Sequence, residues 1–469
     1  MAKDSETPGL TRRLAQFAGT ARLADLDPAD QRVATMQALD SIACILAGST
    51  TQRVAASLEL AATLEGSVPA ENAVPVVGLG TRAGALSATY AMAAACHALE
   101  YDDGNREGSV HPGAAVVPAA LAVAYHRDAS YGETLDAIMA GYEVCITAAE
   151  IMNPQAMARG FQLTPVGGVL GAAAAAGRLL GLDADGIERA IGVAGSASSG
   201  TFAYLAGGGD VKKLHPAHAA RSGVHAAYAE ATGLVTGPRA VLEGPRGLIY
   251  AFAGLGVEAV QHAAYGGQRP AICRSYIKPY PCCRHVQSAV EALAAIVTEH
   301  GLTGEAVARI EVETYAAAMA HAPLPWDTFE VAQLSFPYLM AVTATHGTVG
   351  LAHFDERHRT DAALADLAAR TVIREASDLS AAYPAESPAR VHVTLRDGRS
   401  FERTTHHPPG APEARMSDAA FVAKFAECAR LAPRLPDPDT LLSTLLSPEL
   451  STSGTPMRRV IDKHLVPAP

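Results

Sequence analysis

The chain of 469 residues has few aromatic side chains, which make up 5% of the sequence and include a single tryptophan. Charged residues are also scarce at 18%, whereas hydrophobic residues reach 49%. Alanine supplies much of this apolar content, as in the run 172–176. Because alanine has the highest helix propensity and a small side chain, we expect a mostly helical protein with closely packed helices. The length suggests two domains.

Lysine- and arginine-rich runs are absent, and the formal net charge is −11. Proteins that bind duplex nucleic acid normally present a basic face, so nucleic acid is not an expected partner. The first ten residues lack the apolar core of a signal peptide, and the longest apolar stretches, such as 114–125, are too short to cross a bilayer. We therefore expect a soluble, cytoplasmic protein without a membrane partner.

None of the seven cysteines forms the C-x2-C spacing of a zinc ribbon or an iron–sulfur cluster. The only close group is Cys273, Cys282 and Cys283. Adjacent thiols bridge poorly because the geometry is strained, so a metal or redox pair is the less favoured interpretation. Reduced thiols in a cytosol are the simplest alternative.

Helical spacing of apolar residues dominates the first 268 residues and includes two helices between Leu10 and Gly48, with a break at Asp27-Pro28. Near residue 270 the pattern changes, because 308–315 alternates apolar and polar residues as a half-buried strand does. A β-hairpin is predicted over 389–404, with Asp397-Gly398 at its turn. The predicted organisation is a helical domain over 1–268, a smaller α+β lid domain over 269–406, and C-terminal helices over 407–469 that rejoin the helical domain.

Polar residues crowd into 97–113, where an apolar helix runs into an acidic loop and His111-Pro112-Gly113 opens another helix. Pro112 suits the first helical turn, so we expect His111 beside the free N–H groups of a helix N-terminus. That position suits an anion and an imidazole that transfers a proton. In the alternative interpretation, Asp102 and Asp103 only cap the loop.

Cations gather in two further segments. Lys212 and His215 follow the triple glycine 207–209, and this segment could hold carboxylates or be a basic loop before a helix. Lys278 precedes two prolines that stiffen its loop, and Arg284 and His285 follow them. Tyr338, just after a proline, would by itself more often pack than catalyse.

Together these segments resemble the MmgE/PrpD family, in order and over nearly the whole chain. The matching pieces are His97-Ala-Leu-Glu-Tyr-Asp-Asp with His111-Pro-Gly, Arg159-Gly-Phe-Gln-Leu-Thr with Gly171-Ala-Ala-Ala-Ala-Ala, Val211-Lys-Lys-Leu-His with Ala219-Ala, Val241-Leu-Glu-Gly, Lys278-Pro-Tyr-Pro-Cys-Cys, and Leu334-Ser-Phe-Pro-Tyr.

The resemblance implies a mainly α fold, with a large helical domain built from both chain ends and an inserted α+β lid. It also implies a homodimer, a small di- or tricarboxylate substrate, and no metal or organic cofactor. Among the residues that match the family's cleft are His111, Lys212, Lys278 and Tyr338. The sequence departs from the family pattern at Glu100, usually Asp, at Gly104, usually Thr, and at Gln162, usually His.

On this basis we expect a metal-independent lyase that adds or removes water by proton transfer next to a carboxylate. The expected catalytic residues are His111, Lys212, Tyr338, Asp102 and Asp103. Substrate binding is assigned to Lys278, Gln162, Glu100, His215, Arg284 and His285. Epimerisation of an iminodisuccinate-like acid, decarboxylation of a cis-aconitate-like acid, and a non-catalytic scaffold remain alternatives.

Overall fold

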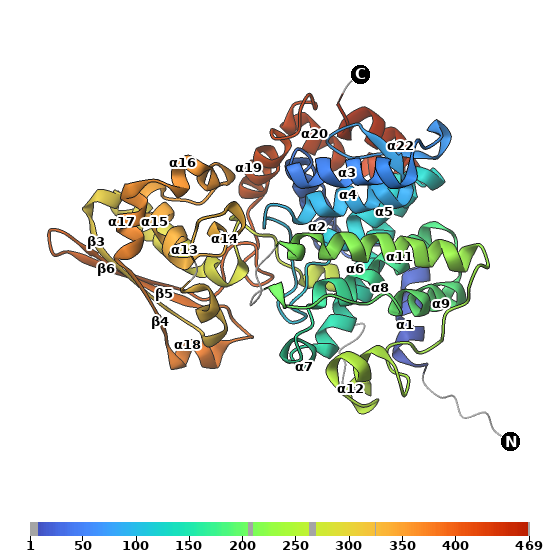
Figure 1. Ribbon diagram of the computed structural model, residues 1–469, viewed down its shortest axis with the longest axis horizontal. Helices are drawn as coiled ribbons and strands as arrows, with labels where there is room; N and C mark the ends of the chain where they lie inside the picture. The colour runs from blue at the N-terminus through green and yellow to red at the C-terminus, as the bar shows by residue number, and fades with distance from the viewer. Residues whose placement is uncertain (1–7, 205–209, 262–268, 324, 468–469) are drawn as a thin grey trace. The chain divides into compact units, whose positions relative to one another are not determined.

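The computed structural model describes residues 8–204, 210–261, 269–323 and 325–467 (Figure 1). The chain forms two compact units. Unit 1 contains Met1–Ala98, Asp102–Tyr276 and Phe421–Pro469, and unit 2 contains Leu99–Tyr101 and Ile277–Ala420. The predicted boundary at 406 thus differs from the end of unit 2, because 407–420 stays with that unit. There, the Ile277 N–H donates to the Gly410 carbonyl at 3.0 Å.

Unit 1 consists mainly of helices. Its helices are α1 (Leu10–Thr20), α2 (Pro28–Gly48), α3 (Gln52–Glu65), α4 (Ala85–His97), α5 (Gly113–Arg127), α6 (Tyr131–Met152), α7 (Gln155–Ala158), α8 (Leu163–Leu179), α9 (Ala184–Gly195), α11 (His215–Ala231), α12 (Glu258–Gln261), α20 (Pro438–Leu445), α21 (Pro448–Thr452) and α22 (Met457–Val460). The Asp27 side chain caps α2 by accepting from the Asp30 N–H at 2.9 Å, as the Asp27-Pro28 pattern predicts. Strands β1 (Ala73–Pro75) and β2 (Arg82–Gly84) form a short antiparallel pair that the sequence did not indicate.

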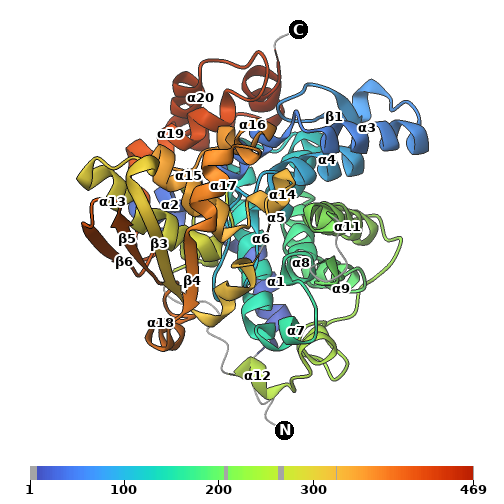
Figure 2. The ribbon, with the colours of Figure 1, turned by 60° about the vertical axis from the view of Figure 1, so that its left-hand side comes forward.

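Helices α6, α8 and α11 pack closely because small residues line their contacts (Figure 2). A Cβ atom at Gly141 would lie 2.7 Å from the main-chain oxygen of Gly171, and one at Gly223 would lie 2.6 Å from Cβ of Ala172. Contacts this short leave no room for a larger side chain. The close packing of helices that the alanine-rich composition predicts is therefore present in unit 1.

A buried ion pair joins two distant parts of unit 1. Lys424, in α19 (Asp418–Ala429), lies 2.5 Å from Asp40 of α2, measured from Nζ to Oδ1. Both residues are buried. The C-terminal segment of unit 1 thus supplies the countercharge for a carboxylate that comes nearly 400 residues earlier in the sequence.

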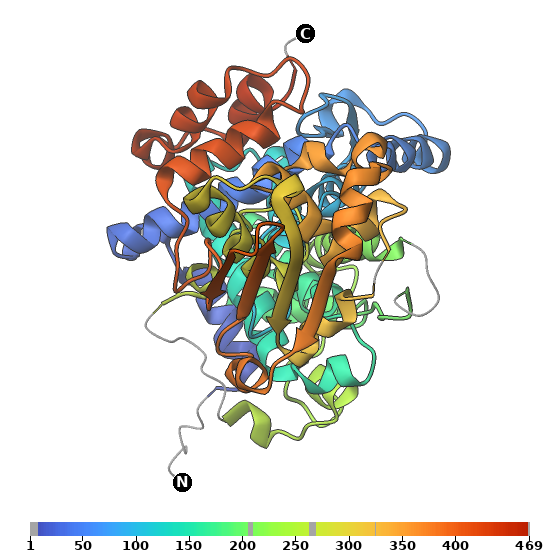
Figure 3. The same cartoon turned by 90° about the vertical axis from the view of Figure 1, so that its left-hand side faces the viewer.

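Unit 2 is built on a four-stranded sheet with the order β4-β3-β5-β6 (Figure 3). Its strands are β3 (Val307–Thr314), β4 (Thr371–Glu375), β5 (Ala389–Leu395) and β6 (Ser400–Thr405). Strand β3 pairs parallel with β4 and antiparallel with β5, and β5 pairs antiparallel with β6. The predicted strand and hairpin are confirmed, whereas β4 carried no clear alternation and was missed.

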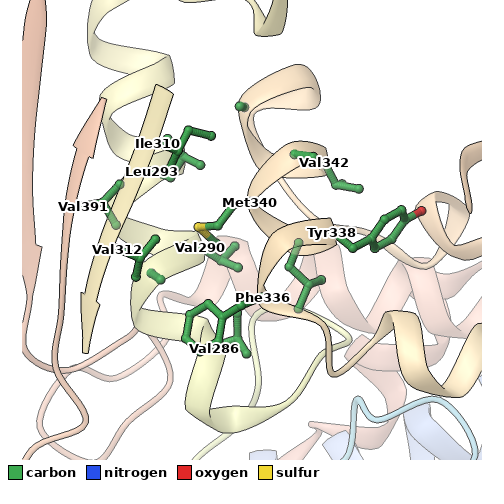
Figure 4. Close-up of a cluster of buried hydrophobic side chains, with 14 of the residues drawn as sticks. Val286, Val290, Leu293, Ile310, Val312, Phe336, Tyr338, Met340, Val342 and Val391 are labelled. Carbon is green, nitrogen blue, oxygen red and sulfur yellow. The ribbon is translucent and has the colours of Figure 1, made fainter. Parts of the chain in front are cut away.

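Helices α13 (Gln287–His300) and α15 (Phe336–His346) pack on this sheet, and α17 (Ala362–Ala369) packs against α15. Apolar side chains of β3 and β5, including Ile310, Val312 and Val391, form one core with Leu293 and Met340 (Figure 4). Shorter helices complete the unit: α14 (Phe329–Ala332), α16 (Glu356–Arg359) and α18 (Ser377–Ala382).

Within the described residues, no single helix has the length and hydropathy needed to cross a bilayer. The bent pair of α2 and α3, at 82°, meets the length and composition criterion only when the two helices are taken together. Most of α2 is buried inside unit 1, which suits a core helix.

Candidate active site

Two histidines of unit 1 share one buried carboxylate. His97, the last residue of α4, has Nδ1 2.7 Å from Oδ2 of Asp102, and Nδ1 of His111 lies 3.5 Å from the same oxygen. The ring centroids of His97 and His111 are 5.1 Å apart. His97 and Asp102 are fully buried, whereas the His111 side chain keeps 17% of its surface exposed. His111 is therefore the member of this cluster that a substrate can reach.

The main chain fixes the tautomer of His111. Its Nδ1 lies 2.6 Å from the main-chain oxygen of Asp103. A carbonyl oxygen can only accept, so Nδ1 carries the hydrogen and Nε2 is the nitrogen that exchanges a proton. The nearby Asp102 carboxylate stabilises the charged imidazolium that forms when Nε2 takes up a proton. This arrangement suits general acid–base chemistry.

Asp103 occupies the N-terminus of α5, where the sequence suggested a bound anion. Its Oδ1 accepts from the Gly113 N–H at 3.1 Å, and its Oδ2 accepts from the Tyr142 hydroxyl at 2.7 Å. Burial raises the pKa of this carboxyl well above its ordinary value. Pro112 is the N-cap of α5 rather than its first helical residue. The two hydrogen bonds of the Asp103 side chain hold the loop against α5 and α6.

A second pair lies at the start of α8 and α11. Nδ1 of His215 donates to Oε1 of Gln162, and both side chains are buried. Burial, followed by the charges of His97, His218 and Lys212, lowers the pKa of His215 to about 4. His215 is therefore neutral at pH 7, with Nε2 carrying a lone pair.

Two further observations connect this pair with the His111 cluster. Thr164, two residues after Gln162, accepts from the His111 N–H at 3.1 Å. The charges of His97 and Lys212 also contribute to the lowered pKa of His215, after the larger effect of burial. Lys212 lies half-buried in the 3-10 turn Val211–Leu214, while the preceding glycines 207–209 fall outside the described residues.

Tyr276 lies against Gly104, one of the three positions that depart from the family pattern. Gly104 and Tyr276 exchange main-chain hydrogen bonds at 3.2 and 2.8 Å. A Cβ atom at Gly104 would overlap the hydroxyl group of Tyr276. A residue larger than glycine therefore requires Tyr276 to shift, because the phenol fills space that a threonine side chain would take.

Unit 2 contains a buried lysine among the predicted binding residues. Lys278 is fully buried, and its Nζ donates to the main-chain oxygen of Glu100 at 2.9 Å. The same Nζ lies 3.6 Å from Oε2 of Glu100. Glu100 has a φ of 53°, an unusual backbone conformation for a residue with a side chain. The structure thus brings these two predicted residues together.

The remaining predicted residues of unit 2 make other contacts. The Tyr338 hydroxyl donates to the His353 carbonyl and extends from α15 on the side away from β3 (Figure 4). Burial raises its pKa. Nη1 of Arg284 donates to Oε1 of Gln287 at 3.3 Å, and Nδ1 of His285 lies 2.7 Å from the Tyr315 hydroxyl.

Four residues of this site carried no predicted role: His97, Tyr142, Thr164 and Tyr276. His97 lies five residues before Asp102 within a quoted motif, and that proximity was the available signal. Tyr142 and Thr164 come from α6 and α8, and no local pattern indicates that they meet the loop. The ligand atoms of His97, Asp102 and His111 also lie close enough to hold a metal ion. However, the Nδ1 atoms nearest the carboxylate already serve in hydrogen bonds to Asp102 and to the Asp103 carbonyl.

The chain belongs to the MmgE/PrpD family. The model of the family's N-terminal domain matches residues 12–259, and that of its C-terminal domain matches residues 280–438.

Cis-aconitate decarboxylase of Aspergillus terreus is 27% identical over 444 residues, which cover 88% of each protein. Cis-aconitate decarboxylase of Homo sapiens is 26% identical over 347 residues, covering 67% of this chain and 66% of the human protein. The cis-aconitate decarboxylase-like protein oryM of Aspergillus oryzae is 31% identical over 205 residues, which span 42% of each protein.

Proposed function

We propose that this protein is a lyase for a small di- or tricarboxylic acid, with His111 as its proton-transfer residue. The observation that carries the proposal is the His111 cluster: a partly exposed imidazole with a fixed tautomer beside a buried carboxylate and a second buried histidine. Decarboxylation is the first candidate reaction, because relatives that match most of the chain are named as cis-aconitate decarboxylases.

In the proposed reaction, the C–C bond to one carboxylate breaks, carbon dioxide leaves, and the electron pair of that bond passes to the substrate carbon. The imidazolium of His111 donates the Nε2 proton to that carbon, and Asp102 compensates the charge of the protonated ring. Lys212 binds a second carboxylate, and neutral His215 offers Nε2 as a hydrogen-bond acceptor. Asp103, Tyr142 and Thr164 act as positioning residues.

Dehydration of a hydroxy acid is the second candidate, and it is the reaction that the sequence motifs favoured. The Gln162–His215 pair bears on it, because a leaving hydroxyl group needs a proton donor. Gln162 stands where the family pattern has a histidine, and an amide cannot transfer a proton. Decarboxylation needs no acid for a leaving hydroxyl group, so this pair favours it. The homodimer, the cytoplasmic location and the contribution of Lys278 and Tyr338 to the same reaction remain predictions.

The test is turnover of cis-aconitate, citrate and 2-methylcitrate by the purified chain, followed by proton NMR in D2O. Decarboxylation of cis-aconitate should yield carbon dioxide and a five-carbon dicarboxylic acid with one deuterium at the protonated carbon. Addition or loss of water would identify a hydro-lyase instead. Deuterium exchange without a new product would indicate an epimerase.

The matched variants are His111→Gln and His225→Gln, the second being an exposed histidine of α11. We expect His111→Gln to lower kcat by about 10²–10⁴-fold with an unchanged fold, and His225→Gln to retain activity. Unchanged turnover in His111→Gln would refute the assigned role. Thermal stabilisation by these acids without turnover would support the non-catalytic scaffold.

A further inference from the structure

Unit 2 holds a cluster of three histidines that the proposed reaction does not use. His346 is the last residue of α15, His353 lies in the 3-10 turn Leu351–Phe354, and His358 lies in α16. One nitrogen from each ring falls within 4.8 Å of one from each of the other two. The ring centroids are 4.5 Å apart for His346 and His353, and 5.4 Å apart for His353 and His358.

We propose that these three histidines bind one Zn²⁺ ion. Neutral imidazole nitrogen is a preferred zinc ligand, and three histidines with a water molecule form a common tetrahedral set. Nitrogens on one tetrahedral ion stand about 3.3 Å apart, and the rings of His346 and His353 are nearly parallel at 13°. One of these two rings must therefore turn about its side-chain bonds before both nitrogens can point at the same ion. His346 is exposed, and the other two rings are half-buried, so solvent can deliver the ion.

His358 already has the hydrogen bonding of a metal ligand. Oδ1 of Asp355 accepts from Nδ1 of His358 at 2.7 Å and from its main-chain N–H at 2.8 Å. The ring is thereby fixed with hydrogen on Nδ1 and a lone pair on Nε2. A carboxylate that holds the second nitrogen in this way orients the imidazole and increases its basicity toward a metal.

His353 must exchange one hydrogen bond for the metal. Its Nδ1 accepts from the Gly350 N–H at 3.0 Å, an arrangement that places the ring hydrogen on Nε2. To ligate, the ring gives up this neutral hydrogen bond, which is weak beside a zinc–imidazole bond. Binding would then tie the end of α15 to the two short helical segments that follow it.

The test is Zn²⁺ binding to the full chain after removal of metal with a chelator. Equilibrium dialysis with elemental analysis gives the stoichiometry, and competition with a chromophoric chelator gives Kd. Titration with Co²⁺ adds a visible absorption spectrum that reports tetrahedral nitrogen ligation. We expect the double variant His346→Gln/His358→Gln to bind one ion fewer than the wild type, with the cobalt absorption lost.

Matched controls separate this site from general surface binding. The variant His300→Gln/His406→Gln removes two exposed histidines of unit 2 outside the cluster and should bind as the wild type does. Asp355→Asn keeps a good N-cap residue but removes the carboxylate, so it should weaken binding by about 10–100-fold. Zinc should also raise the Tm of the wild type but not that of the double variant.

Equal stoichiometry and Kd in the wild type and the cluster variants would overturn the proposal. An equal loss in the His300→Gln/His406→Gln control would do the same. If the double variant fails to fold, His346→Gln alone decides the question. This exposed residue supplies one of three ligands, and unchanged zinc affinity would contradict its role.

Discussion

Nδ1 of His111 is held 2.6 Å from the main-chain oxygen of Asp103, eight residues earlier in the chain. Because the acceptor belongs to the backbone, no side-chain substitution at position 103 removes it directly. The loop conformation thus sets the protonation pattern of the ring, and Asp102 adds the negative charge. The position of the ring hydrogen on His111 and the negative charge beside the ring can therefore be varied separately.

Asp102→Asn tests the charge. The amide is close in size to the carboxylate but cannot compensate a protonated His111, so kcat should fall by about 10²–10⁴-fold with little change in KM. Steady-state kinetics measure this, with Asp397→Asn, an exposed position in the β5–β6 turn, as the control. A variant that keeps wild-type kcat would remove Asp102 from the mechanism.

Lys278→Met tests whether the buried lysine of unit 2 binds substrate. A charge-assisted hydrogen bond to a carboxylate contributes about 1.5–3 kcal/mol, so its loss should raise KM by roughly 10–100-fold. Because Glu100 would also lose its cation, circular dichroism must show an intact fold. Glu100→Gln breaks the same pair while keeping Lys278, so a larger rise in KM for Lys278→Met than for Glu100→Gln assigns the effect to the lysine. An unaltered KM in a folded Lys278→Met variant would argue against substrate binding by this residue.

Gly104→Thr restores the residue that the family pattern has at this position, yet it should destabilise this chain. Its Cβ overlaps the Tyr276 hydroxyl group, and such overpacking typically costs about 1–3 kcal/mol. Adding Tyr276→Ala should recover part of the loss, because the aromatic ring is the obstacle. Urea denaturation of both variants checks this, and equal stabilities of wild type and Gly104→Thr would contradict the overlap.

His215 should make stability depend on pH. Its pKa is about 4 in the folded chain, mainly because of burial, and about 6.5 when unfolded. The unfolded state therefore binds more protons between these values, and stability present above pH 6.5 is lost as the pH falls toward 4. After allowance for screening, the loss attributable to His215 is about 2 kcal/mol.

This contribution is measured from the free energy of unfolding at pH 7.0 and 4.5 in the wild type and His215→Gln. The variant should lose about 2 kcal/mol less across this interval. Identical pH dependence would mean that His215 titrates normally in the folded chain.

Lys424→Met should be strongly destabilising, because it leaves the buried Asp40 carboxylate without its countercharge. Loss of one partner from a buried pair typically costs about 3–5 kcal/mol. Combining it with Asp40→Leu removes both charges and should restore most of the stability. Thermal and urea unfolding of the two single variants and the double variant give the coupling energy. Additive effects would show that the ion pair is not the cause.

The periodic parts of the fold were predictable from the sequence because each depends on local spacing. The Asp27 cap of α2, strand β3 and the hairpin turn at Asp397-Gly398 all follow such rules. Strand β4 was missed because a short parallel strand next to β3 carries little alternation of its own. The inclusion of Leu99–Tyr101 in unit 2 depends on contacts with residues near position 278, and no local pattern shows them.

The candidate site was predictable only in part, for the same reason. Six of the predicted residues lie in unit 1 and come from the segments that resemble the family: Asp102, Asp103, His111, Gln162, Lys212 and His215. The function of Asp103 as a link to Tyr142 and Gly113 depends on the packing of α5 against α6. Tyr276 lies 172 residues after Gly104, so only the fold shows that it fills the space of the missing threonine.

The Asp40–Lys424 pair also affects the order in which the two units can fold during synthesis. A ribosome releases Asp40 long before Lys424, and all of unit 2 emerges between them. During that interval the α2 carboxylate lacks its countercharge, so α2 cannot take its final buried position at low cost. The helical unit should consequently complete its packing only after Lys424 has left the exit tunnel, while the inserted sheet can fold first.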